Sequence, residues 1–214
     1  MRRGLPTVVT LTAALVLAAA CSTGDGISGT ASSAPTTAGG VDPSSTAASA
    51  LPYAGAPKVE NPLPESVLSG DPCADALTPE QVKQAVGAVV EGKPDSSLAA
   101  SVGLSCAWIN HGTHGQIVVT YAGARKTGLS GVYENSQPKN PVWRPLADVH
   151  GFPGVAYSDN TDSDCTATVG LADDLSVDVS AVLSTAKEGK ADSCDAAVQM
   201  AGLVVDTLKK RAGS

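Results

Sequence analysis

The sequence predicts an α+β fold in which an antiparallel β-sheet lies between an N-terminal and a C-terminal helix. One helix pattern starts near residue 78, another covers 193–210, and at least five strand patterns separated by turn residues lie between them. The chain has 214 residues, of which 43% are hydrophobic and 16% are charged. This composition excludes disorder of the whole chain, and the length allows one ordinary domain plus a tail.

Residues 1–20 have the pattern of an export signal. Arg2-Arg3 precedes an apolar run of 16 residues, which is shorter than the ~20 residues of a membrane-spanning helix. The following segment, Leu17-Ala18-Ala19-Ala20-Cys21, resembles a bacterial lipobox, although that motif favours leucine at the position of Ala18. The resemblance implies removal of residues 1–20 and lipidation of Cys21, which would anchor the protein to a membrane. Plain secretion with a free thiol at Cys21 is the alternative.

Residues 21–64 are predicted to form a tether. Ser, Thr, Gly, Ala and Pro account for 25 of the 29 residues between Ser22 and Ala50. No apolar periodicity is present, so burial cannot offset the loss of chain entropy. Four prolines between residues 51 and 64 then favour a stiffer, extended segment that leads into the fold. A single α+β domain is predicted over residues 65–214.

The first helix is predicted to begin at Thr78-Pro79-Glu80-Gln81. Thr78 can accept a hydrogen bond from the amide of Gln81, the Gln81 side chain can reach back, and proline suits the first helical position. An apolar face with helical spacing follows at Val82, Ala85, Val86 and Val89. The segment Gly92-Lys93-Pro94 is predicted to end the helix.

Five strands and two further helices are predicted in the rest of the domain. The strands cover 104–109, 116–122, 154–158, 165–170 and 175–182, with a hairpin loop at 111–115 and turns at 159–164 and 172–174. A short helix is predicted over 125–135. The last helix covers 193–210 and has acidic residues at its start and Lys209-Lys210-Arg211 at its end, as the helix dipole favours.

Four cysteines remain besides Cys21, an even number that suits an oxidising compartment. They allow three pairings, and the sequence alone does not choose among them. Our hypothesis is Cys73–Cys106 and Cys165–Cys194, because each bond would join a strand to a residue at or just before a helix start and close a loop of about 30 residues. A structural zinc site is the alternative, which the lack of a Cys-x-x-Cys pair in an exported chain disfavours.

The order of several motifs resembles that of one family. The motifs are Asp71-Pro72-Cys73, Leu77-Thr78-Pro79-Glu80-Gln81-Val82, Cys106-Ala107-Trp108, a strand that begins at Cys165, and Cys194-Asp195-Ala196-Ala197. Together they resemble DUF3558, a group of actinobacterial lipoproteins, over about residues 71–208. The resemblance implies a cell-envelope lipoprotein whose sheet is flanked by helices in a PsbP/Mog1-like fold. It brings no catalytic residue.

Two segments offer candidate metal ligands. His111 and His114 could place two imidazoles near one ion, but they lie in a Gly-bounded loop without a His-Glu-x-x-His pattern, so two exposed histidines are the favoured interpretation. The oxygen-rich segment 159–164 lacks the spacing, glycine and glutamate of an EF-hand, so a solvated turn is favoured over a calcium site. We therefore expect no metal and no cofactor.

Trp143 and Arg144 are the candidate interface residues. They lie in a proline-flanked segment, 140–145, that we interpret as a loop, and interfaces favour both residue types. Packing of this loop onto the sheet is the alternative. Trp108 lies beside Cys106 on a predicted inner strand and is expected to be a core residue.

Charge and motifs limit the possible functions. The net charge of −7 argues against a nucleic-acid binder, which needs Lys and Arg to neutralise phosphates. The sequence contains neither a Gly-x-Ser-x-Gly elbow nor a phosphate-binding loop, so neither motif indicates an enzyme. We expect a binding or interaction module, held by its lipid at the outer face of the cytoplasmic membrane, that meets an envelope protein, a lipid or a small ligand. The alternatives are a structural envelope component and a metal-assisted or unrecognised hydrolase that uses His111, His114 or the acidic turn.

Overall fold

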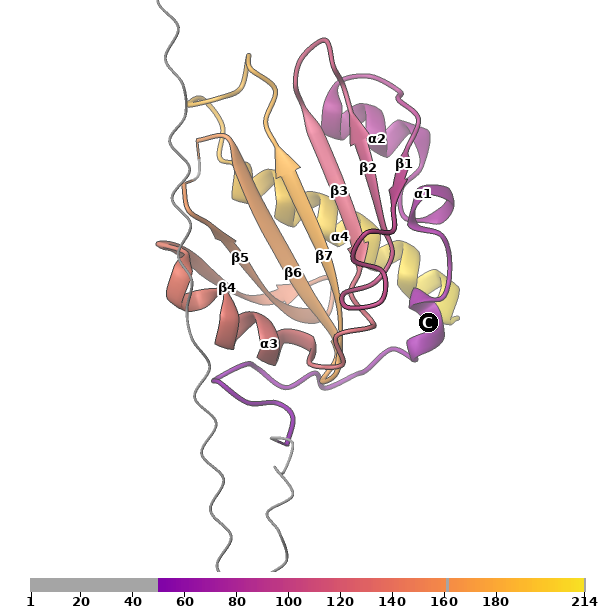
Figure 1. The fold of residues 1–214 in the computed structure, drawn as a ribbon, viewed down its shortest axis with the longest axis vertical. Coiled ribbons are helices and arrows are strands. Elements are labelled where there is room, and N and C mark those ends of the chain that lie inside the picture. Colours follow the sequence, from indigo (N-terminus) through magenta and orange to yellow (C-terminus); the bar gives the residue numbers. More distant parts are fainter. Residues whose placement is uncertain (1–49, 161, 214) are drawn as a thin grey trace, which may run out of the picture. The chain divides into compact units, whose positions relative to one another are not determined.

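A seven-stranded antiparallel sheet forms the centre of the part of the chain that the computed structural model describes, residues 50–160 and 162–213 (Figure 1). The strands lie in the order β1-β2-β3-β7-β6-β5-β4. Their bounds are Lys93–Asp95 (β1), Ser105–Ile109 (β2), Gln116–Tyr121 (β3), Val142–Val149 (β4), Phe152–Ser158 (β5), Asp164–Ala172 (β6) and Leu175–Val182 (β7). The predicted signal peptide, the lipidation residue Cys21 and the tether up to residue 49 lie outside the described residues.

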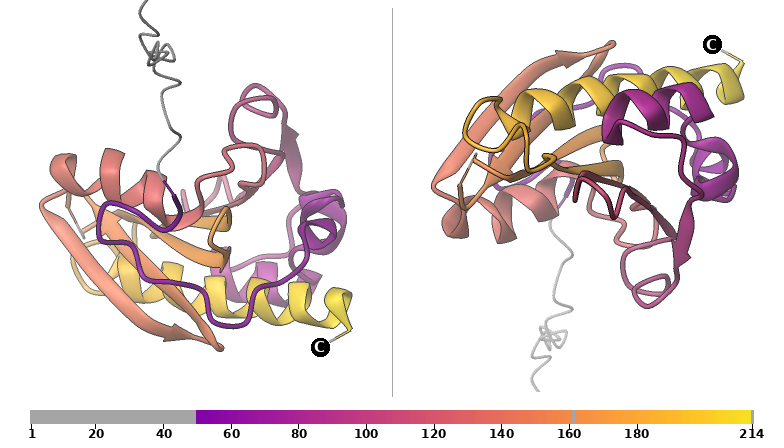
Figure 2. Two further views of the ribbon diagram at one scale, coloured as in Figure 1. Left: turned by 90° about the horizontal axis from the view of Figure 1, so that it is seen from below. Right: turned by 90° about the horizontal axis from the view of Figure 1, so that it is seen from above.

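Helices cover both faces of this sheet (Figure 2). The helices α2 (Pro79–Val86) and α4 (Ser193–Ala212) lie on one face, and α3 (Gly128–Asn135) lies on the opposite face. Three short helical elements complete the fold: η1 (Glu65–Leu68), α1 (Pro72–Asp75) and η2 (Gln137–Lys139). The predicted α+β class is confirmed, because the antiparallel sheet has helices before and after it in the chain.

The alternation of side chains along β7 gives the two faces of the sheet different characters. Val177, Val179 and Ala181 are buried in the main core. Helix α4 contributes the other half of this core through Ala197, Ala201, Val204, Val205 and Leu208. Successive residues of a strand point to opposite faces, so Ser176, Asp178 and Ser180 lie on the face that α3 covers. Apolar burial therefore holds α4 to the sheet, and polar groups remain on the other side.

Helix α2 begins as predicted and ends earlier than predicted. Thr78 accepts from the amide of Gln81, and the Gln81 side chain accepts from the amide of Thr78 at 2.7 Å. Gly87 follows the helix with a φ of +83°, a left-handed conformation that glycine adopts without a steric penalty. The prediction that Val89 belongs to the buried helix face is therefore wrong, and this side chain is 62% exposed.

Both disulfide bonds that we predicted are present. One joins Cys73 of α1 to Cys106 of β2, and the other joins Cys165 of β6 to Cys194 in the first turn of α4. The start of α4 has a second link to the sheet. Asp192 caps the helix by accepting from the amide of Cys194, and its other carboxylate oxygen accepts from Arg144 of β4 at 2.6 Å. A covalent bond and an ion pair therefore fix the same end of the helix.

Two strands at the edges of the sheet were missed by the sequence analysis. The segment around Trp143 and Arg144 is not a loop, because it forms edge strand β4, which pairs with β5. The opposite edge strand, β1, contains part of the segment that we predicted only as a helix stop. Each edge strand carries a proline, Pro145 in β4 and Pro94 in β1. Proline cannot donate to a sheet ladder and is tolerated at an edge, which explains both errors.

The packed part of the chain starts before the predicted domain boundary at residue 65. Val59 and Leu63 belong to the core, and the Leu63 amide donates to the carbonyl of Leu171 at 2.8 Å. The amide of Val59 donates to Asp173, and the amide of Tyr53 donates to Ser130, both at 2.9 Å. The end of the predicted tether is therefore part of the domain.

A polar cluster connects the end of α4 to the start of the fold. Arg211 contacts the carboxylate of Asp75 at 2.5 Å and donates to the carbonyl of Val67 at 2.7 Å. The hydroxyl of Tyr121, a residue that is 2% exposed, donates to the other oxygen of Asp75 at 2.7 Å. Strand β3, α1 and α4 therefore meet at the Asp75 carboxylate, and η1 joins them through Arg211.

Removing the Tyr121 hydroxyl should weaken this cluster. In Tyr121→Phe we expect the free energy of unfolding to fall by about 1 kcal/mol, because a buried hydrogen bond to a carboxylate is lost. Urea denaturation measures the change. Tyr133→Phe is the matched control, since the Tyr133 hydroxyl has no hydrogen bond within the described residues. Equal losses in the two variants would contradict the proposed role of the cluster.

The stability contributed by Asp192 should depend on pH. The hydrogen bond from Arg144 and those from the amides of Asp195 and Cys194 hold the Asp192 pKa below its ordinary 3.8. A carboxyl group whose pKa is lowered in the folded state stabilises the fold above the unfolded-state pKa, and this contribution disappears as the pH falls through the lowered value. We expect Asp192→Ala to lose about 1 kcal/mol at neutral pH, the typical value of a helix cap. Thermal unfolding at several pH values measures the difference in stability between the variant and wild type, which should shrink below pH 3.8. A difference that stays constant across this pH range would contradict the prediction.

Candidate functional site

A buried ion pair lies on the face of the sheet that α3 covers. Asp178 of β7 is 8% exposed. Thr168 of β6 donates to one of its carboxylate oxygens at 2.8 Å, and Arg125 contacts the other at 3.0 Å. Burial raises the pKa of Asp178, and the charge of Arg125 and the hydroxyl of Thr168 act in the opposite direction. A charge this deep in a sheet reduces stability unless it is paired, which makes it a candidate for a functional role.

Tyr157 of β5 extends this ion pair into a network. Its hydroxyl lies near the side chains of Thr168 and Ser136. Burial raises the pKa of Tyr157, and the nearby negative charge of Asp178 raises it further. Within this group of polar side chains, the hydrogen bond from Thr168 and the ion pair with Arg125 hold the Asp178 carboxylate in position.

An aromatic cluster supports Tyr157 from the side. The centroid of the Trp143 ring lies 5.7 Å from that of Tyr157 and 5.0 Å from that of Tyr133. The rings of Trp143 and Tyr133 meet edge to face. The Trp143 indole nitrogen is buried and has no hydrogen-bond partner within the described residues. Tyr133 is a residue of α3, so the cluster also fixes this helix against the edge of the sheet.

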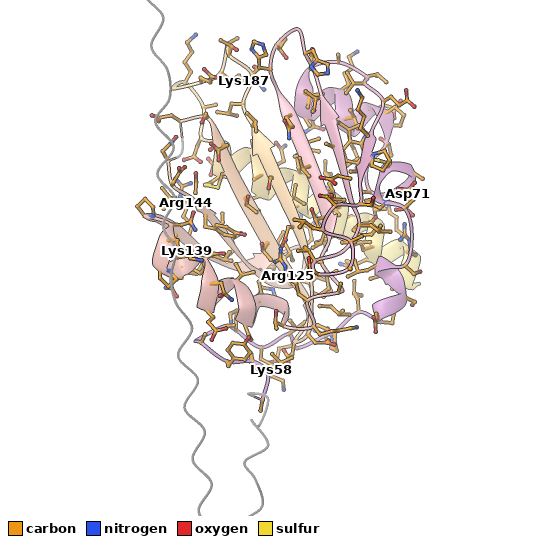
Figure 3. All side chains as sticks on the ribbon, in the orientation of Figure 1. Lys58, Asp71, Arg125, Lys139, Arg144 and Lys187 are labelled. Carbon is orange, nitrogen blue, oxygen red and sulfur yellow. A yellow bond between two sulfur atoms is a disulfide. The ribbon has the colours of Figure 1, made fainter. Side chains whose placement is uncertain are left out.

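A cavity of about 440 Å³ lies above this network. Its walls come from α3, from the segment between β3 and α3, and from the loop 96–104, which projects from the same face of the sheet as α3 (Figure 2). We call it the α3 cavity, and its lining residues are Ser101, Arg125, Thr127, Gly131, Val132, Asn135, Ser136 and Tyr157. Arg125 lies in front of the sheet, next to the start of α3 (Figure 3). Two members of the network, Arg125 and Tyr157, thus face a space of the size that small ligands occupy.

Two other cavities are larger, and the charged side chains in their walls are exposed. A groove of about 740 Å³ runs between residues 55–60 and the β4–β5 hairpin, with Pro57, Pro145 and Pro153 in its walls. A cavity of about 510 Å³ lies between η1 and the other side of loop 96–104. The α3 cavity is the strongest candidate site because its lining belongs to a network that contains a buried charge.

The candidate metal ligands do not come together. His111 and His114 are exposed in the β2–β3 loop, and the His114 ring nitrogen lies 3.2 Å from the Thr185 hydroxyl. In the acidic segment, Asn160 accepts from the amide of Asp162 at 3.1 Å, Asp162 and Ser163 lie in a turn, and Asp164 begins β6. No group of three or more His, Cys, Asp or Glu side chains in the described part of the chain could hold a metal ion.

The two candidate interface residues point to opposite faces of β4. Trp143 joins the aromatic cluster beside α3, whereas Arg144 reaches Asp192 and Asp195 at the start of α4 (Figure 3). This arrangement follows from their adjacent positions in a strand. The two side chains therefore do not form one surface, and an interface role for either residue stays a prediction.

The sequence analysis did not identify the four central residues of the site, which are Arg125, Tyr157, Thr168 and Asp178. One signal was available in Val177-Asp178-Val179, since a charged residue inside an apolar strand needs a buried partner. The partner could not be found in the same way. Arg125 is 53 residues away in the chain, and only the pairing of β3 with β7 brings the two segments together.

The buried Asp178 carboxylate should make stability fall as pH rises. Because its pKa is raised above 3.8 in the folded state, wild-type protein loses stability between that value and the raised pKa. Asp178→Asn removes this dependence and keeps an acceptor for Thr168. Thermal unfolding of both proteins at several pH values tests this expectation. The stability of Asp178→Asn relative to that of wild type should increase as the pH rises from acidic to neutral.

Asp159→Asn, which removes one exposed negative charge, serves as the control for the Asp178 variant. A relative stability of Asp178→Asn that falls as the pH rises would show that the ion pair with Arg125 outweighs the effect of burial.

The comparisons with known proteins identify a family and nothing narrower. A family profile described as "Protein of unknown function (DUF3558)" matches residues 16–207. Neither the search of curated proteins nor the search of solved structures found a match. The PsbP/Mog1-like fold therefore stays a prediction. Because the profile covers residues 16–207, which is most of the chain, the chain belongs to the DUF3558 family.

Proposed function

We propose that the mature protein is an exported lipoprotein whose domain binds a small ligand in the α3 cavity. In this proposal Cys21 carries the lipid, residues 22–49 form a flexible leash, and the domain acts at the outer face of the cytoplasmic membrane. The observation that carries the binding role is the α3 cavity itself, where the buried Asp178 holds Arg125 and the Trp143 ring supports Tyr157.

The anchoring part of the proposal rests on sequence patterns. Small residues precede Cys21 after a short apolar run, and a stretch rich in Ser, Thr, Gly and Ala follows it. Two disulfide bonds join the four remaining cysteines, and such bonds persist in oxidising compartments outside the cytosol. Among the described residues, no helix is long and apolar enough to cross a membrane.

The binding part of the proposal rests on the chemistry of the cavity. Its volume of about 440 Å³ lies within the range of small-molecule sites, and most of its lining side chains can form hydrogen bonds. Arg125 and Tyr157 are positioned before any ligand arrives, which reduces the ordering cost of binding. A hydrolase would need a nucleophile or a metal-bound water near a base, and neither the exposed His111 and His114 nor the acidic turn provides such a group in the described structure.

The first test concerns the anchor. We expect wild-type protein to fractionate with membranes and the mature N-terminal peptide to carry acyl groups on Cys21 by mass spectrometry. Cys21→Ser should move the protein out of the washed membrane fraction, because two or more acyl chains are needed for stable attachment. Ser22→Ala is the matched control and should stay in the membrane fraction. A wild-type mature protein without acyl groups would refute the anchor.

The second test concerns the cavity. Native mass spectrometry of wild-type protein purified from membranes of its own host should show a bound small molecule. Asn135→Trp places a large ring at the rim of the cavity and should lower the occupancy of that molecule severalfold. Gln137→Trp adds the same ring two residues away, outside the lining, and should leave the occupancy unchanged. A bound molecule that both variants retain would place binding elsewhere and refute the proposed site.

A further inference from the structure

We infer that the α3 cavity takes a small, neutral, polyhydroxylated ligand of about the size of a monosaccharide. The inference rests on the proposed function, because it names the ligand class of the same cavity. It follows from three properties of the lining: the type of its polar groups, the balance of its charge, and the rigid aromatic ring at one wall.

The polar groups of the lining suit hydroxyls. Ser101, Thr127, Ser136 and Tyr157 contribute hydroxyl groups, and Asn135 contributes an amide whose nitrogen already donates to the carbonyl of Gly131 at 2.8 Å. A hydroxyl both donates and accepts, as each group of a polyhydroxylated ligand does. An apolar ligand would bury these groups without hydrogen-bond partners, which would weaken its binding.

The charge of the cavity favours a neutral ligand. Arg125 is the one charged side chain among the described lining residues, and Asp178 balances its charge at 3.0 Å. A cation would meet the exposed part of the Arg125 guanidinium, whose side chain is 31% exposed. An anion would be repelled by Asp178 behind the guanidinium and by a chain with a net charge of −7. The remaining guanidinium donors can still bind the lone pairs of a hydroxyl oxygen.

The shape of the lining favours a ring with one polar and one apolar side. Tyr157 presents an aromatic ring that stacks on Trp143 at a tilt of 32°, and Gly131 and Val132 of α3 add a wall without polar side-chain atoms. The hydroxyl of Tyr157 lies near the side chains of Ser136 and Thr168. A sugar ring could therefore place its C–H surface against the apolar part and its hydroxyls towards Arg125 and the serine and threonine groups.

Three sugars that share one ring test the inference. Glucose is neutral, glucuronate carries a carboxylate, and glucosamine carries an ammonium group. Full-length lipoprotein in detergent micelles is titrated with each sugar, and binding is followed by saturation-transfer NMR. We expect glucose to bind at least about tenfold more tightly than either charged sugar, which corresponds to about 1.4 kcal/mol.

Matched variants assign the binding to the cavity. Tyr157→Phe should weaken glucose binding about fivefold, because one hydrogen bond of about 1 kcal/mol is lost. Tyr133→Phe, in the same aromatic cluster but outside the cavity lining, should leave it unchanged. Asn135→Trp should abolish binding. Thermal unfolding of each variant verifies that it is folded, and Ser101→Ala provides a second lining variant if Tyr157→Phe does not fold.

The outcomes separate this inference from the proposed function. Tighter binding of glucuronate than of glucose, lost in Arg125→Gln, would overturn the neutral class and leave the cavity as a binding site. Failure of all three sugars to bind would overturn the polyhydroxylated class, and the occupancy test with Asn135→Trp would still decide whether the cavity binds another molecule. Sugar binding that survives in Asn135→Trp would contradict both proposals.

Discussion

The pairing of Arg125 with the buried Asp178 carboxylate determines how one side of this molecule is built. A carboxylate that is 8% exposed needs a partner, and this need fixes the segment between β3 and α3 over the strands β6 and β7. The same segment leads directly into α3, which forms one wall of the α3 cavity. Without the pair, Arg125 would have no partner to hold it over the sheet, whereas Tyr157 keeps the support of the Trp143 ring.

The other side of the sheet supplies the stability that this arrangement requires. Helix α4 packs its apolar stripe on β6 and β7, and its two ends are fixed by different means. At the start, the Cys165–Cys194 bond and the Arg144–Asp192 ion pair hold it to the sheet. At the end, Arg211 reaches Asp75 and the carbonyl of Val67. The polar network under α3 can therefore contain a buried charge because the opposite face is apolar and firmly attached.

The sequence predicted local features well and long-range contacts poorly. The cap at Thr78, the strand over 175–182 and the last helix were recognisable because each is encoded within a few neighbouring residues. Cysteine pairing was accessible because few combinations exist and each bond joins a strand to a helix start. Strand β4 was missed, since Pro145 resembles a loop residue until its position at the sheet edge is known. The site was missed because Arg125 and Asp178 meet only through the pairing of β3 with β7.

The prolines at the two edges of the sheet have a consequence for proteins that share a surface. Attachment by a lipid would confine many copies to one plane, where collisions between exposed strands become frequent. Strands β1 and β4 each contain a proline, which has no backbone donor, and β4 also has an irregular register between Leu146 and Val149. Both features discourage the addition of a neighbour's strand to an open edge. On a membrane, if the proposed lipid holds the protein there, the same features would keep the sheet of one copy from extending into the next.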